Sequence, residues 1–257
     1  MNSIHIPDHK KIYFLSDAHL GLPPLNKSLQ KEKLLVRWLE EIRSDAHSVY
    51  LLGDIFDYWF EYKKVVPRGF TRLLGKLSEL TDSGIPVYFF TGNHDVWVFD
   101  YLPSETGIEV FRNPIRIEIN SKKFYIAHGD GLGKYETSYR ILKRIFTSKT
   151  IQWLFARIHP NASIAFAHAW SKHSRLSKDA SLPFMGEDKE FQVLFSKDFL
   201  KKEHFHFFVY GHRHLPLDIS IGENSRMVCL GDWFHNFTYA VFNGKDMELK
   251  RYTENLT

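Results

Sequence analysis

Five short apolar runs constrain the fold of this chain more than any other feature of its sequence. The runs are rich in Phe, Tyr, Val and Ile, and they occupy residues 12–15, 49–52, 87–90, 124–127 and 207–210. Continuous apolar runs of this length are typical of strands that are buried on both faces. Helical periodicity over residues 34–42 and 70–80 separates the first three runs, so we predict an α/β fold in which helices cover a central sheet.

The sequence after Gly211 changes to strands and turns. Apolar segments at 217–221, 227–230, 239–242 and 248–252 are punctuated by Gly222-Glu-Asn and by Asn243-Gly-Lys-Asp. Both turn sequences are typical of β-hairpins. We therefore expect the C-terminal part of the chain to complete the sheet structure.

Residues 132–178 interrupt the alternation, because they contain no convincing strand and show apolar positions at helical spacing. The segment holds nine basic residues against the single acid Glu136, a net charge of about +8, which leaves the rest of the chain at about −4. We interpret it as a basic, aromatic helical cap, called the helical insertion below, between core segments 1–131 and 179–257. The alternative is a solvated helical hairpin that serves packing alone.

Composition and charge narrow the function classes. The apolar content of 44% and the charged content of 25% are ordinary for a globular protein, and the net charge of +4 is too small to indicate a nucleic-acid binder. The single cysteine, Cys229, excludes an intrachain disulfide and a cysteine-based zinc site, and fits a reducing compartment. Residues 1–8 are polar and unlike a signal peptide, and no apolar run approaches the roughly 20 residues of a membrane span.

Each of the five strand-like runs is followed at once by side chains that bind metals. Because the carboxyl ends of parallel strands share one edge of a sheet, we expect these five loops to converge. Glycine in four of them permits tight turns and close approach of the backbone. The five loop sequences are Asp17-Ala-His19, Gly53-Asp54-Ile-Phe-Asp57, Gly92-Asn93-His94-Asp95, His128-Gly129-Asp130 and Gly211-His212-Arg-His214.

The predicted donors are carboxylates, imidazoles and an amide, without a thiolate. Oxygen and nitrogen donors of this kind suit Mn, Fe, Zn or Co. Seven donors exceed the four of a structural tetrahedral site, and they suit two ions that share a bridging carboxylate. Asp95 and Asp130 are not counted as ligands, because each is equally well explained as a turn residue or helix cap and as a partner that orients an imidazole. Asp57 is not counted either, because its side chain could instead fix the loop that carries Asp54.

The five motifs, in this order, resemble those of the calcineurin-like metallophosphoesterase superfamily from about Ile12 to Leu215. The resemblance implies a four-layer α-β-β-α sandwich with an inserted helical cap. It implies that Asp17, His19 and His214 hold one metal ion and that Asn93, His128 and His212 hold another. It further implies that Asp54 bridges the two ions, and that His94 is catalytic, contacting the phosphoryl oxygens or the leaving group.

Three features resemble one family of this superfamily, the UDP-2,3-diacylglucosamine hydrolases of lipid A synthesis. They are the aromatic stretch from Leu52 to Phe60, the sequence from His128 to Tyr139, and the helical insertion itself. The resemblance implies hydrolysis of the pyrophosphate at the α-phosphorus, giving UMP and 2,3-diacylglucosamine 1-phosphate. One branch of that family carries arginine where this chain has His94. The residues expected to bind substrate are Asn93, His94, Glu136, Ser171, Arg175, Lys178 and His212.

The resemblance also sets expectations for cofactors, partners and location. We expect two divalent ions, with Mn²⁺ first and Fe²⁺, Zn²⁺ or Co²⁺ as alternatives. The expected partners are a nucleotide-sugar lipid and, peripherally, a membrane surface attracted by the basic insertion; no nucleic acid and no obligate protein partner are expected. The expected location is the cytoplasm, at the inner membrane.

Three other functions stay open from the sequence. A phosphodiesterase or pyrophosphatase for soluble nucleotide-type substrates predicts an insertion without a groove for acyl chains. A nuclease would use the basic insertion for phosphate contacts, although the interrupted basic pattern disfavours it. A non-enzymatic scaffold is disfavoured because every expected donor and His94 are present.

Overall fold

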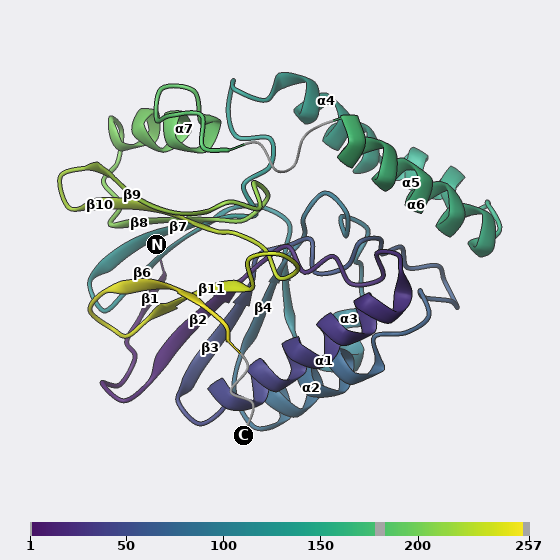
Figure 1. The fold of residues 1–257 in the computed structure, drawn as a ribbon, viewed down its shortest axis with the longest axis horizontal. Coiled ribbons are helices and arrows are strands. Elements are labelled where there is room, and N and C mark those ends of the chain that lie inside the picture. Colours follow the sequence, from purple (N-terminus) through teal and green to yellow (C-terminus); the bar gives the residue numbers. More distant parts are fainter. Residues whose placement is uncertain (1, 178–182, 254–257) are drawn as a thin grey trace.

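Two six-stranded sheets form the centre of the protein in a computed structural model that describes residues 2–177 and 183–253. The first sheet has the strand order β12-β11-β2-β3-β4-β5, and the second has the order β1-β6-β7-β8-β10-β9 (Figure 1). The strands are β1 Asn2–Ile4, β2 Lys11–Leu15, β3 Ala46–Leu51, β4 Val87–Phe90, β5 Glu109–Phe111, β6 Ile115–Ile119, β7 Lys122–Ile126, β8 Phe207–Tyr210, β9 Pro216–Gly222, β10 Ser225–Leu230, β11 Thr238–Phe242 and β12 Met247–Arg251.

Helices cover both outer faces and complete a four-layer arrangement. Helices α1 (Leu25–Ile42), α2 (Thr71–Asp82) and α3 (Tyr101–Thr106) lie on the first sheet, and α7 (Phe191–Leu200) lies on the second (Figure 1). The two sheets face each other across a buried cluster that includes Phe14, Phe124 and Phe242. The predicted α-β-β-α sandwich is therefore confirmed.

The prediction of one central sheet from the alternation is wrong, because the five apolar runs divide between two sheets. The first three runs become β2, β3 and β4, which pair in parallel, while the last two become β7 and β8, also a parallel pair. Both faces of each strand are buried because one side meets helices and the other meets the opposite sheet. The apolar pattern alone does not distinguish this burial from that of a single sheet covered by helices on both faces.

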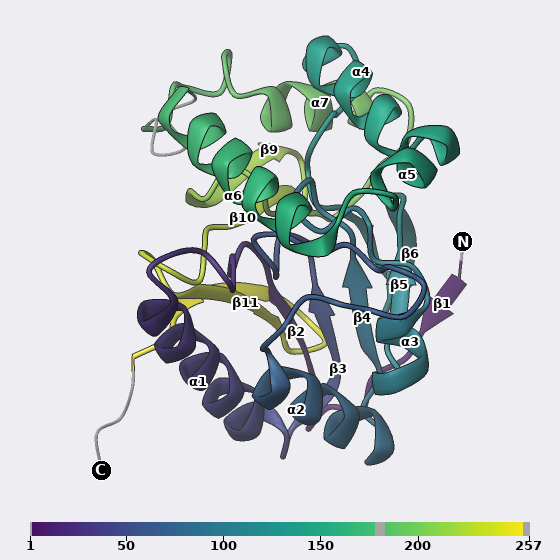
Figure 2. The same cartoon turned by 90° about the vertical axis from the view of Figure 1, so that its right-hand side faces the viewer.

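The helical insertion forms three helices, α4 (Thr137–Phe146), α5 (Lys149–Phe155) and α6 (Pro160–Ser177). They lie above the carboxyl ends of β2, β3 and β4 (Figure 2). Phe146 and Phe155 pack against Phe60 and Trp97 of the core, and the Trp97 indole nitrogen donates a hydrogen bond to the Phe146 carbonyl over 2.8 Å. None of the helices in the described ranges combines the length and hydropathy that crossing a bilayer requires.

Candidate metal centre

The loops after β2, β3, β4, β7 and β8 meet at one place, as their sequences predict. All seven predicted donors lie there, each just beyond the end of its strand, and only three of them are more than marginally accessible to solvent. Three groups of side chains in the described part of these loops have donor atoms no more than 4.8 Å apart. Two of these groups include Asp54, and the third consists of His19, Asp57 and His94. The seven residues are Asp17, His19, Asp54, Asn93, His128, His212 and His214.

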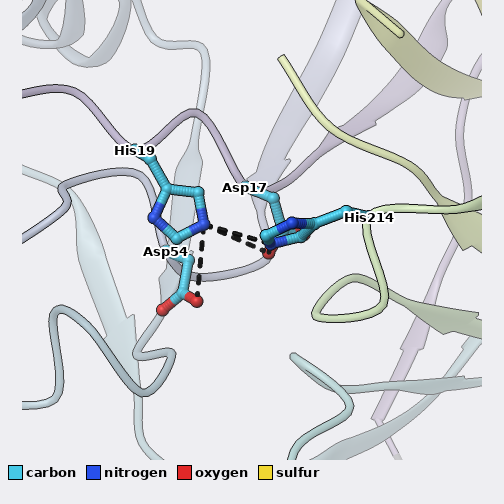
Figure 3. A group of neighbouring side chains, drawn as sticks. All are labelled: Asp17, His19, Asp54 and His214. Atoms are coloured by element: carbon cyan, nitrogen blue, oxygen red, sulfur yellow. Dashed lines mark hydrogen bonds and ion pairs between the residues drawn. The ribbon is translucent and has the colours of Figure 1, made fainter. Parts of the chain in front are cut away.

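The first group consists of Asp17, His19, Asp54 and His214 (Figure 3). His214 Nε2 lies 3.2 Å from Asp17 Oδ1, and His19 Nε2 lies 3.8 Å from Asp54 Oδ2. The two imidazoles face each other, with 3.1 Å between their Nε2 atoms. Four donors from three loops thus surround one position.

The second group brings Asn93, His128 and His212 together beside Asp54. Asp54 Oδ2 lies 3.5 Å from His128 Nε2. The Asn93 side-chain oxygen lies 2.9 Å from His212 Nδ1 and 3.4 Å from His128 Nε2. The Nδ1 atom of His128 faces the Leu52 carbonyl at 2.6 Å, which fixes the ring with Nε2 turned to the site.

The donor set fits two divalent cations. Neutral imidazoles, carboxylates and an amide oxygen are ligands of Mn, Fe, Zn and Co. Asp54 belongs to both groups, which is the arrangement of a two-metal site with a shared carboxylate. Its burial, at 1% exposure, keeps water from competing for the carboxylate.

The backbone of these loops adopts an uncommon conformation. Among the residues that the structure describes, ten non-glycine residues have positive φ, and five of them are predicted donors. Such conformations persist in bulky residues only where surrounding contacts enforce them, and they concentrate at functional sites. The five donors are Asp17, His19, Asp54, His212 and His214.

Two glycines permit the loops to approach each other. A Cβ atom at Gly211 would lie 2.5 Å from Asp17 Oδ2, which itself accepts a hydrogen bond from the His212 backbone over 2.9 Å. A Cβ atom at Gly92 would collide with the Asp54 carboxylate. These glycines are therefore needed for contact between neighbouring loops as well as for tight turns.

The charges of the site favour bound cations. Burial raises the pKa of Asp17 and of Asp54, but the surrounding imidazoles outweigh it and hold both pKa values below the ordinary value. Burial lowers the pKa of His128, yet the Asp54 carboxylate outweighs it and raises this pKa to about 10. For His19, burial prevails and the pKa falls to about 4. The carboxylates thus stabilise positive charge at this edge of the sheets.

His94 lies beside the donors and is held by a different contact. Its Nδ1 lies 2.9 Å from the Asp57 backbone carbonyl, and its backbone nitrogen donates to Asp54 Oδ1 over 2.8 Å. The ring meets that of His19 edge to face, with 4.7 Å between centroids. The Asp57 carboxylate lies 3.4 Å from His19 Nδ1 and 3.7 Å from His94 Nδ1, so it orients both imidazoles.

Asp95 and Asp130 have other contacts. The buried Asp95 carboxylate accepts hydrogen bonds from the backbone of Gly92 and of residues 54–56, so it fastens the loop that carries Asp54. Asp130 pairs with Lys143 of α4 over 2.7 Å. Loop fixing and imidazole orientation, which the sequence left open for these aspartates, are therefore divided between Asp95 and Asp57.

The predicted substrate residues of the insertion are less fully described. Glu136 Oε1 lies 3.9 Å from His212 Nε2, and Glu136 Oε2 accepts a hydrogen bond from the Gly131 backbone over 2.7 Å. Ser171 and Arg175 belong to α6, but their side chains lie outside the described part of the structure, as does Lys178 altogether.

One aromatic residue at the site had no signal in the sequence. Phe234 meets the rings of His19 and His214 edge to face, at centroid distances of 5.6 Å and 5.2 Å. The loop that carries it is closed by Asp232, and Asn236 donates to the His214 carbonyl over 3.0 Å. Phe234 follows β10, whose sequence carries no metal-binding motif.

Comparison with known proteins agrees with this geometry. Residues 10–216 match the family described as calcineurin-like phosphoesterase. The chain belongs to that family. It is a hydrolase by this membership, and its own His/Asp cluster indicates divalent metal ions.

Curated relatives carry a more specific name. A UDP-2,3-diacylglucosamine hydrolase of Porphyromonas gingivalis is 39% identical over 93% of this chain and 97% of its own length. A protein of the same name from Actinobacillus succinogenes is 28% identical over 94% of this chain and 99% of its own. Among solved structures, the E. coli phosphoesterase Yfce aligns at a TM-score of 0.44 and 14% identity, covering 90% of this chain and 87% of its own.

Proposed function

We propose that this chain is a dinuclear-metal phosphohydrolase that cleaves the pyrophosphate of UDP-2,3-diacylglucosamine to UMP and 2,3-diacylglucosamine 1-phosphate. The observation that carries the reaction class is the pair of buried donor groups that share Asp54. The names of the relatives, aligned over nearly the whole chain, support the substrate.

The proposed ligands divide as their positions suggest. Asp17, His19 and His214 hold one ion, Asn93, His128 and His212 hold the second, and Asp54 bridges them. Bound divalent cations supply charge neutralisation for phosphoryl oxygens and lower the pKa of water. The oxygen and imidazole donors without a thiolate suit Mn²⁺, which we propose first, with Fe²⁺, Zn²⁺ or Co²⁺ as alternatives.

His94 is the proposed catalytic side chain. The Asp57 carbonyl occupies its Nδ1, so Nε2 is the atom assigned to the phosphoryl oxygens or the leaving group. The neighbouring Asp57 carboxylate, 3.7 Å from Nδ1, helps to orient the ring. In this role His94 donates a hydrogen bond or a proton to the oxygen that departs.

The helical insertion supports an acylated, anionic substrate. Among the side chains of this segment that the structure describes, seven large apolar ones are exposed although a packed core is close by. Its basic residues provide charge for a diphosphate, and one of them, Lys143, reaches Asp130 beside the metal donors. We assign Glu136, Ser171, Arg175 and Lys178, with Asn93, His94 and His212, to substrate binding. The exposed apolar residues are Ile141, Ile145, Ile151, Trp153, Leu154, Ile158 and Phe166.

The same segment supports peripheral binding to a membrane. Exposed apolar side chains interspersed with lysine and arginine favour adsorption to anionic lipid. We therefore propose that the protein meets its lipid substrate at the inner membrane surface without an obligate protein partner.

The test compares matched substrates with purified protein and Mn²⁺. We expect UMP release from UDP-2,3-diacylglucosamine, loss of activity with a chelator, and at least about 10-fold slower cleavage of UDP-N-acetylglucosamine, which lacks the long chains whose burial stabilises binding. Equal rates on both substrates would favour the soluble nucleotide-type alternative. Phosphohydrolysis that persists in chelator would contradict the metal-dependent mechanism.

A further inference from the structure

The first turn of α7 contacts two of the loops that carry metal donors. Gln192, 2% exposed, donates its side-chain amide to the Gly211 carbonyl over 2.9 Å and lies 3.5 Å from the Gly129 carbonyl. Gly129 follows His128, and Gly211 precedes His212. One buried side chain therefore spans the loops after β7 and β8.

A second contact from the same turn reaches between two donors. Arg213 donates from Nε to Glu190 Oε2 over 3.0 Å and from Nη2 to Glu190 Oε1 over 2.9 Å. The Glu190 side chain is 2% exposed and that of Arg213 is 11% exposed. A planar guanidinium that meets a carboxylate through two parallel hydrogen bonds is held in both position and orientation.

Arg213 lies between two predicted metal donors in the chain, so its ion pair with Glu190 can fix both of them. His212 and His214 flank it, and both adopt left-handed backbone conformations with φ of 69° and 53°. The Arg213 backbone nitrogen donates to the Gly211 carbonyl over 2.9 Å, which makes the loop a tight turn. Such a turn with two bulky residues at positive φ needs an external anchor to persist.

The charge of the pair also matters. A buried guanidinium near the donors would repel cations, and the Glu190 carboxylate neutralises its charge. Glu190 further accepts a hydrogen bond from the Met185 backbone over 3.2 Å. The carboxylate therefore links the donor loop to the segment that follows the helical insertion.

We infer that Glu190 and Arg213 are positioning residues of the metal centre: their ion pair fixes the turn that presents the imidazoles of His212 and His214 to the two cations. The inference rests on the proposed function, because it assigns a role within the proposed site. Neither residue is expected to touch metal or substrate.

The experiment measures Mn²⁺ binding to metal-free protein by titration calorimetry, together with the thermal midpoint of the metal-free state. The variants are Glu190→Gln, Arg213→Met and Arg213→Lys, with the double variant Glu190→Leu/Arg213→Met, in which apolar residues of similar volume replace the pair and preserve the fold. The matched control is Arg226→Met, which removes an exposed two-point pair with Asp218 on β9 and β10.

We expect affinity for Mn²⁺ to fall about 10- to 100-fold in Glu190→Gln, Arg213→Met and the double variant, as for other partners that orient ligands. Arg213→Lys, which keeps the charge, should recover part of the loss, and Arg226→Met should bind as the wild type does. The double variant should keep a metal-free midpoint close to that of the wild type.

Two results would overturn the inference while leaving the proposed function standing. Wild-type affinity in Glu190→Gln and Arg213→Met would show that the turn holds without the pair. The second result is a double variant that binds Mn²⁺ normally, while the single variants lose affinity in proportion to their fall in thermal midpoint. The ion pair would then serve the stability of the fold alone. A wild-type protein that binds none of Mn²⁺, Fe²⁺, Zn²⁺ and Co²⁺ would refute the proposed function itself, and this inference with it.

Discussion

The metal centre and the helical insertion differ in how the fold holds them. At the metal centre, five loops from the two sheets are joined by buried hydrogen bonds, and Asp54 is 1% exposed. In the insertion, Trp153 and Phe166 are 57% and 60% exposed, and the contacts with the core include an aromatic cluster around Trp97. Under the proposed function, the contrast places the reaction chemistry in the buried loops of the sandwich and substrate choice in the more exposed insertion.

The largest expected effect comes from removing the carboxylate shared by both donor groups. Asp54→Ala should lower turnover by at least about 10³-fold, because transition-state stabilisation by both cations is lost. The fall in turnover is measured as the rate of phosphodiester hydrolysis, and the metal content is measured by atomic emission. Asp218→Ala, an exposed carboxylate on β9, should remain at the wild-type rate. A wild-type rate in Asp54→Ala would refute the bridging role.

A smaller loss of turnover is expected from removing the His94 side chain, which lies beside the donors. His94→Ala should lower turnover by roughly 10²-fold or more, because a positioned acid is lost, while metal content stays close to two ions per chain. The same two assays apply. Loss of metal in this variant would mean that His94 is a ligand, and would move it from the catalytic role into the donor set.

The insertion should affect substrate choice alone. Trp153→Ser and Phe166→Ser should each raise KM for UDP-2,3-diacylglucosamine by about 10-fold, because each removes an apolar surface for acyl chains. Cleavage of a small soluble diester should not change. Leu25→Ser, which alters an equally exposed residue of α1 at 67% exposure, is the control. If cleavage of both substrates were impaired equally, the insertion would also affect the reaction itself, and the division of roles between the two regions would be wrong.

The smallest expected effect concerns the buried Cys229, which packs against one of the donor loops. Burial raises the pKa of Cys229 to about 12, and its sulfur lies 3.6 Å from the Gly211 carbonyl of a donor loop. We expect Cys229 to resist thiol reagents in native protein at pH 8 and to react promptly in denaturant. Rapid labelling of the folded protein would show that this loop opens.

The donors were predictable because each stands directly after an apolar run. Asp17, Asp54 and His128 follow strand ends, and local sequence alone places them at the carboxyl edge of parallel strands. The division into two sheets was not predictable from the alternation, because a strand such as β3 reads as apolar whether a helix or another sheet covers it. The two-sheet sandwich was expected only because the five motifs resemble those of the metallophosphoesterase superfamily.

Contacts between residues far apart in the sequence could not be predicted from the apolar pattern or from the motifs. Phe234 reaches His19 from the loop after β10, and Glu190 reaches Arg213 from the start of α7. Neither belongs to a motif, and their neighbours depend on how β10 and α7 pack. The roles of Asp57 and Asp95 were left open for the same reason, since either carboxylate can serve an imidazole or a turn.

The most direct measurement of the central claim is anomalous diffraction at the manganese edge from crystals of the protein grown with Mn²⁺. The account predicts two peaks roughly 3.5–4 Å apart, with Asp54 between them and the six other donors divided three and three. A single peak, or peaks away from the loops after β2, β3, β4, β7 and β8, would contradict it.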